Sequence, residues 1–124
     1  MKRIKLLFAQ VELPLVLRNT PTAQAILHAL PQHSVTHTWG EEVYFEIPVT
    51  VPLEADAKDI VSPGEIAFWT EGNCIAIGYG PTPISSGTEI RLATRTNIWA
   101  DSESDVAILR HVSAGESVRI EELN

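Results

Sequence analysis

Residues 35–47 have the sequence Val-Thr-His-Thr-Trp-Gly-Glu-Glu-Val-Tyr-Phe-Glu-Ile. Large side chains alternate with polar ones over residues 35–39, and apolar ones alternate again over residues 43–47. This period of two is typical of strands with one buried face. The segment Gly40-Glu41-Glu42 lies between the two runs and has the composition of a turn. The stretch therefore predicts a β-hairpin, and it indicates that the chain is built mainly from strands.

Similar signals occur on both sides of this hairpin. Residues 4–8 and 11–17 predict an N-terminal hairpin, in which Pro14 lacks an N–H and should lie at an edge or an irregularity. Residues 66–69 and 74–79 flank Glu71-Gly72-Asn73, which predicts a second tight hairpin. Elsewhere the patterns predict a polar connector over 55–62, a long irregular loop over 80–97, an acidic turn over 101–105, and strands at 98–99, 106–112 and 118–123.

One segment has the features of a helix. Thr20 is a suitable N-cap, and Pro21 suits the first helical position. Apolar residues then follow at helical spacing, and Pro31 ends the pattern. We expect a helix over residues 21–30, with about eight to ten short strands around it. This combination favours a closed barrel or a sandwich in a single domain spanning residues 1–124.

Composition narrows the range of partners. The chain has 124 residues and a net charge of −7, and its nine basic residues are scattered apart from three near the start. Binding to nucleic acid or to an anionic membrane needs clustered Lys and Arg, so we expect neither partner. A single cysteine and the lack of a long apolar run suggest a cytoplasmic protein. A homo-oligomer remains possible.

The side chains that could carry chemistry form no known motif. The four histidines are spread along the chain and Cys74 is the only cysteine, so we expect no metal site and no cofactor. Cys74 begins an apolar strand, which favours a buried, inert thiol. Glu41, Glu42 and Glu46 could include an acid–base pair, but charged residues next to a turn are more often solvated.

Several segments together resemble the small prokaryotic cyclophilin-like proteins. They are Asn19 to Ala23, Leu30-Pro31, Trp39 to Phe45, Gly64 to Trp69, Gly72-Asn73 and Tyr79 to Ser85. The resemblance covers nearly the whole chain. It implies a mostly β fold, a closed cyclophilin-like barrel of about eight strands with one or two short helices. The chain lacks the Phe-His-Arg and Gln-Gly-Gly signature of the prolyl isomerases in that fold.

Three hypotheses about function follow from this resemblance. The first is a barrel that binds a small ligand or a peptide segment without catalysis. The second is an atypical peptidyl-prolyl isomerase or another small-substrate enzyme, with an arginine as its electrostatic group. The third is a structural subunit with an exposed patch. The candidate ligand-binding residues are aromatic, amide, hydroxyl and guanidinium side chains: Trp39, Tyr44, Phe45, Asn73, Tyr79, Thr82, Arg91 and Arg95.

Overall fold

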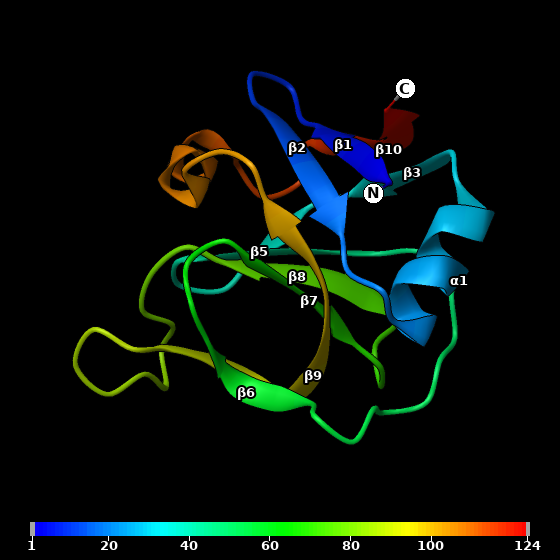
Figure 1. Ribbon diagram of the computed structural model, residues 1–124. Coiled ribbons are helices and arrows are strands. Elements are labelled where there is room, and N and C mark those ends of the chain that lie inside the picture. The colour runs from blue at the N-terminus through cyan, green and yellow to red at the C-terminus, as the bar shows by residue number, and fades with distance from the viewer. Residues whose placement is uncertain (1, 124) are drawn as a thin grey trace.

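The computed structural model describes residues 2–123, and within them the chain is mainly strand (Figure 1). One α-helix, α1, spans Pro21–Ala29, and one 3-10 helix, η1, spans Val106–His111. The strands are β1 Arg3–Leu7, β2 Glu12–Leu17, β3 Gln32–Val35, β4 His37–Thr38, β5 Glu42–Glu46, β6 Lys58–Val61, β7 Glu65–Trp69, β8 Cys74–Gly78, β9 Ile90–Ser102 and β10 Ser117–Leu123.

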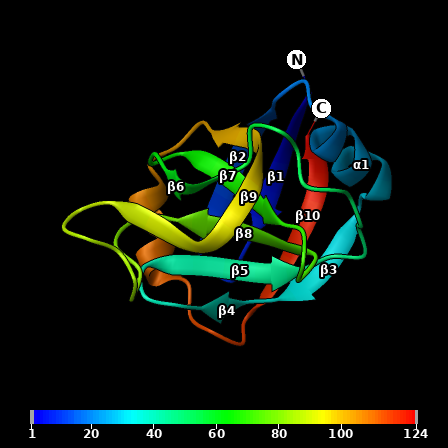
Figure 2. The same cartoon turned by 90° about the horizontal axis from the view of Figure 1, so that it is seen from below.

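The strands form one strongly curved sheet. Its order is β3-β10-β1-β2-β9-β7-β8-β5-β4, with β6 paired to β9 beside this path. All of these pairs are antiparallel. The two end strands, β3 and β4, are consecutive in the chain, so the sheet curls into a nearly closed barrel (Figure 2). The expected mostly β barrel with one or two short helices is confirmed.

Helix α1 begins where its sequence predicts. The Thr20 hydroxyl accepts a hydrogen bond from the Ala23 N–H at 3.1 Å, which caps the first turn. Ala23 and Ile26 are fully buried and join the main core. The helix ends at Ala29, one residue earlier than predicted, with extended backbone at Leu30.

Two apolar clusters lie in the fold. The main core fills the barrel and includes residues from β1, β2, β5, β7, β8 and β10. A second, smaller cluster consists of Val61, Ala67, Ala76, Ile90, Leu92 and Ile98, with Tyr44 packed against it. Strands β7 and β8 contribute to both clusters, because successive side chains of a strand point to opposite faces. These strands are therefore covered on both faces.

Strand β9 belongs to both clusters because its register shifts at Trp99. Ala100 lies opposite Ile66 of β7, whereas Ala67 lies opposite Ile98, so Trp99 is the extra residue of a β-bulge. Ile98 belongs to the small cluster, while Trp99 and Ala100 both belong to the main core. The indole N–H of Trp99 is satisfied by donating to the Ala67 carbonyl at 3.1 Å.

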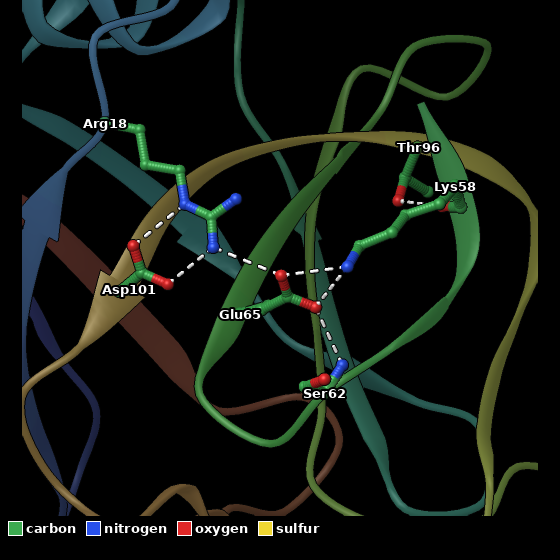
Figure 3. A network of polar contacts seen from close by, with 6 residues as sticks. All are labelled: Arg18, Lys58, Ser62, Glu65, Thr96 and Asp101. Carbon is green, nitrogen blue, oxygen red and sulfur yellow. Dashed lines mark hydrogen bonds and ion pairs between the residues drawn. The ribbon is translucent and has the colours of Figure 1, made fainter. Parts of the chain in front are cut away.

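A network of charged side chains joins four strands at one side of the barrel (Figure 3). Arg18, just after β2, donates to both carboxylate oxygens of Asp101 on β9, at 2.7 and 2.8 Å. It also donates to Glu65 of β7, which in turn pairs with Lys58 of β6 at 2.7 Å. Burial raises the pKa of Glu65, but hydrogen bonds from Lys58, the Ser62 N–H and Arg18 outweigh it and lower the pKa overall.

Four sequence predictions need correction. The segment 80–97 is not one long loop, because β9 begins at Ile90 and runs for 13 residues. The connector over 55–62 contains β6. The predicted strand 106–112 is the helix η1, whose first turn is capped by the Asp105 carboxylate accepting from the Ala107 N–H. The predicted strand 35–39 is split at Thr36, whose hydroxyl donates to the carbonyls of Ser113 and Glu116.

The Asn97 side chain generates a stability prediction. It is fully buried and donates to the Thr22 hydroxyl and the Pro52 carbonyl, at 2.9 and 3.0 Å, while accepting from the Glu54 N–H at 2.8 Å. Asn97→Ala removes all three hydrogen bonds from a fully buried position and should lower the free energy of unfolding by about 2–3 kcal/mol, measured by urea denaturation. The exposed Asn19→Ala should change it by less than about 0.5 kcal/mol. Equal effects of the two variants would contradict this assignment.

Candidate functional site

A depression lies over the outer face of β5, β8 and β7. Its volume is about 200 Å³. Three aromatic side chains and one carboxylate, together with small and hydroxyl-bearing residues, form its walls. The lining residues are Trp39, Glu42, Tyr44, Trp69, Ala76, Leu92, Ala93, Thr94 and Thr96. We call this depression the aromatic cavity.

Strand register explains why these residues meet. Glu42 and Tyr44 are two apart on β5, so they point to the same face of the sheet. Tyr44 lies opposite Ala76 of β8, and Ala76 lies opposite Ala67 of β7, two residues before Trp69. Strand β9 supplies the remaining wall, from Leu92 to Thr96.

Glu42 is a buried residue of the cavity lining. Its residue exposure is 7%. Gly78 of β8 lies directly opposite it, and the side chain of Ile90 occupies the space that a Gly78 side chain would need. Leu92 also approaches Gly78. Close packing of β9 on this glycine thus removes water from the Glu42 carboxyl, and this burial raises its pKa to about 7.

Two polar atoms in the walls have no hydrogen-bond partner. Among residues 2–123, the buried side-chain nitrogen and oxygen atoms without a partner are Oε1 of Glu42 and Nε1 of Trp69. Both residues line the aromatic cavity. Buried polar groups are nearly always hydrogen-bonded, and leaving one unpaired costs about 1–3 kcal/mol. One unpaired acceptor and one unpaired donor therefore belong to residues that line the cavity.

The aromatic walls are held by local packing. The ring of Trp69 lies against Gly72, where any side chain would overlap it. Tyr44 stacks on His37 of the neighbouring β4, with ring centroids 5.2 Å apart and planes 24° apart. Trp39 follows β4, and its backbone N–H donates to the Glu42 carbonyl at 3.0 Å. The turn between β4 and β5 thus fixes Trp39 next to Glu42.

Two of the eight candidate residues from the sequence line the aromatic cavity, Trp39 and Tyr44. Phe45 points to the opposite face and is fully buried in the main core, where its ring packs edge-on against Phe8. The Asn73 amide faces the backbone carbonyls of Thr70 and Val49 in the β7–β8 turn. Tyr79 packs at the edge of the main core.

The remaining three candidates surround the start of β9. The Thr82 hydroxyl donates to the Arg91 carbonyl, which fastens the loop before β9. The Arg91 guanidinium pairs with Glu89 at 2.7 Å and with Asp59 at 3.1 Å. Arg95 is exposed, although its neighbours Thr94 and Thr96 line the cavity. The structure therefore does not bring these three side chains together with Trp39 and Tyr44.

Sequence reasoning did not single out most of the lining residues. Glu42 was considered as part of a carboxylate group, but the default interpretation of a solvated turn left it aside. A signal for it exists, because Glu42 shares a two-residue spacing with Tyr44 within a strand. Trp69, Ala76 and the β9 residues could not be found in this way, since their positions depend on strand pairing and on recognising β9.

Three other features to consider in residues 2–123 are a metal site, a membrane-spanning helix and a reactive thiol. No group of three or more His, Cys, Asp or Glu side chains there could hold a metal ion. None of the described helices has the length and apolar character needed to cross a membrane. Cys74 is buried, and desolvation together with Glu46 and Glu42 raises its thiol pKa to about 11, so the reactive thiolate is disfavoured.

The curved sheet flanked by short helices defines a cyclophilin-type barrel. A family model described as Cyclophilin-like matches residues 2–121. The chain therefore belongs to the cyclophilin-like family.

Solved structures agree with this assignment. The solution structure of the hypothetical protein AF2241 from Archaeoglobus fulgidus is 35% identical, with a TM-score of 0.84, and the match covers 98% of this chain and 95% of that one. The structure of McbB in complex with tryptophan has a TM-score of 0.64 at 17% identity, covering 95% of this chain and 44% of that one, which shows a shared fold alone. No curated protein matches the chain.

The raised pKa of Glu42 makes stability depend on pH. Below the ordinary pKa of 4.5 the Glu42 carboxyl is neutral in both the folded and the unfolded state, and stability is not reduced. As pH rises towards about 7, ionisation favours the unfolded state, and the loss of stability is complete once the buried carboxyl also ionises. Because glutamine cannot ionise, Glu42→Gln removes this pH-dependent loss of stability. The variant should therefore gain stability relative to the natural protein between about pH 4 and pH 8, by on the order of 3 kcal/mol.

Urea denaturation at several pH values measures this difference. Glu46→Gln is the matched control, because Glu46 lies on the same strand and the same face but is exposed. It should give a difference from the natural protein that changes little with pH. If the free energy of unfolding of Glu42→Gln depended on pH in the same way as that of the natural protein, Glu42 would not be desolvated.

Proposed function

We propose that this cyclophilin-like barrel binds a small, largely apolar molecule in the aromatic cavity, with Glu42 as the polar anchor. The observation that carries this proposal is that both unpartnered buried polar atoms, Oε1 of Glu42 and Nε1 of Trp69, belong to walls of one cavity. Ligand sites typically combine apolar and aromatic walls with a few polar groups that fix orientation.

The size of the cavity limits the ligand. Its volume of about 200 Å³ is below the roughly 300–1,000 Å³ of sites for drug-sized molecules. A molecule of about one ring, or one side chain of a larger molecule, fits this space. The ligand should carry a hydrogen-bond donor for Glu42 and an acceptor for the Trp69 indole.

A second candidate function is a small-substrate enzyme in which Glu42 exchanges a proton with the bound molecule. The observation that favours it is the raised pKa of Glu42, about 7, since general acids and bases work best near the ambient pH. Prolyl isomerisation through an arginine draws no support from the geometry. Arg91 is held in two ion pairs, and neither Arg91 nor Arg95 lines the cavity.

The binding test uses the tryptophans as reporters. Three single-ring probes, benzamide, imidazole and phenol, are titrated into nitrogen-labelled protein while the indole N–H signals are recorded. At least one probe should shift the signals of Trp39 and Trp69 in a saturable manner and leave Trp99 unchanged, because Trp99 is buried in the main core. Unmoved Trp39 and Trp69 signals with all three probes would refute the proposed site.

Variants that fill the cavity provide the control. Ala76→Leu fills its floor and Ala93→Leu its exposed rim, and each should weaken probe binding at least about tenfold by steric exclusion. Ala114→Leu, at an exposed turn before β10, should bind as the natural protein does. Thermal melting verifies that each variant is folded. Binding that survives both cavity variants would place the ligand elsewhere.

A further inference from the structure

The lining of the aromatic cavity contains an acidic side chain and no basic one. Glu42 is the only acidic residue in its lining, and the lining contains no Lys, Arg or His. The two guanidinium groups nearest in sequence to the β9 wall, those of Arg91 and Arg95, are not in the lining. A buried carboxylate without a counter-ion is costly, and a cation is the partner that would offset this cost. The net charge of −7 also favours the approach of cations.

The aromatic side chains in the cavity lining also favour a cation. Trp39, Tyr44 and Trp69 form three of the walls, and each is half-buried, so its ring remains accessible. The face of an aromatic ring attracts a cation within about 6 Å, most strongly for Trp, and such aromatic groups recognise alkylated ammonium ions. The remaining side chains, Ala, Leu and Thr, are small or neutral.

We infer that the aromatic cavity takes a small organic cation, with its ammonium group facing the Glu42 carboxylate and its alkyl groups against Trp39, Tyr44 and Trp69. This inference rests on the proposed function and names the chemical class of its ligand. The unpartnered indole N–H of Trp69 further favours a cation that also carries a hydrogen-bond acceptor, such as a hydroxyl group.

Binding of such a cation depends on the protonation of Glu42. The carboxyl must be ionised to attract the ligand, and burial raises its pKa to about 7. Neighbouring elements carry further charged or titratable side chains, but in residues 2–123 none forms a hydrogen bond or ion pair with the Glu42 carboxylate. These side chains are His37, Glu41, Glu46, Glu65, Cys74, Arg91 and Arg95. Protonation of Glu42 therefore governs the expected pH dependence.

The test compares choline with 3,3-dimethylbutan-1-ol, which has the same shape and hydroxyl group but no charge. Titration calorimetry should show choline binding at least about tenfold more tightly than the neutral compound near pH 8. Because choline keeps its charge at all pH values, its affinity should fall about tenfold between pH 8 and pH 6, as Glu42 becomes protonated.

Glu42→Gln should reduce the preference for choline and abolish its pH dependence, whereas Glu46→Gln should retain both. Equal binding of the two compounds by the natural protein, or no choline binding near pH 8, would overturn the cation assignment. Binding of the uncharged probes benzamide or phenol at the Trp39 and Trp69 indoles would then still support the proposed function. Failure of these neutral probes as well would refute the site itself.

Discussion

The change of face at the Trp99 bulge is the constraint on which both apolar clusters depend. Without the extra residue, Ile98 and Ala100 would point to the same face of β9 and could not belong to different clusters. With it, the second half of β9 closes the barrel against β2 and β7, and the first half lies over the outer face of β7 and β8. The ion pairs of Arg18, Asp101, Glu65 and Lys58 secure the strands around this point.

The packing of β9 over the outer face of β7 and β8 also creates the aromatic cavity. Ile90 and Leu92 close on Gly78, which buries Glu42, while the wider part of the same face remains open between Trp39, Tyr44 and Trp69. The protein thus keeps a desolvated carboxyl that weakens its own stability at neutral pH. Unpaired buried polar groups that lower stability are common at sites that are arranged for a ligand rather than for folding.

Local patterns were sufficient for much of the fold but not for the site. Thr20 and Pro21 mark the start of α1, and the turn at Asn73, with a φ of 54°, joins β7 and β8 as expected. Residues 98–99 of β9 were predicted as a strand, but its first part, from Ile90 to Asn97, was missed because the many Pro, Gly, Ser and Thr residues over 80–97 predicted a loop. Residues 106–112 were predicted as a strand because Val106, Ile108 and Val112 are β-branched and lie at even spacing, whereas the buried pair Val106 and Leu109 has the three-residue spacing of a 3-10 helix.

The cavity was harder to predict because it depends on pairing between distant strands. Glu42 and Trp69 are far apart in the sequence and two strands apart in the sheet, and only the register of β5 with β8 and of β8 with β7 places them on one face. The burial of Glu42 depends further on Gly78, whose missing side chain has no signal in the hydrophobic pattern.

The distribution of the three tryptophans gives the protein two separate optical reporters. Trp99 is sealed in the main core, so its emission follows the integrity of the barrel. Trp39 and Trp69 border the aromatic cavity, next to a carboxyl that changes charge near neutral pH, so their emission follows the polarity of that space. Replacing Trp39 and Trp69 with phenylalanine therefore leaves an indole that reports unfolding, and replacing Trp99 leaves two that also report changes in the cavity.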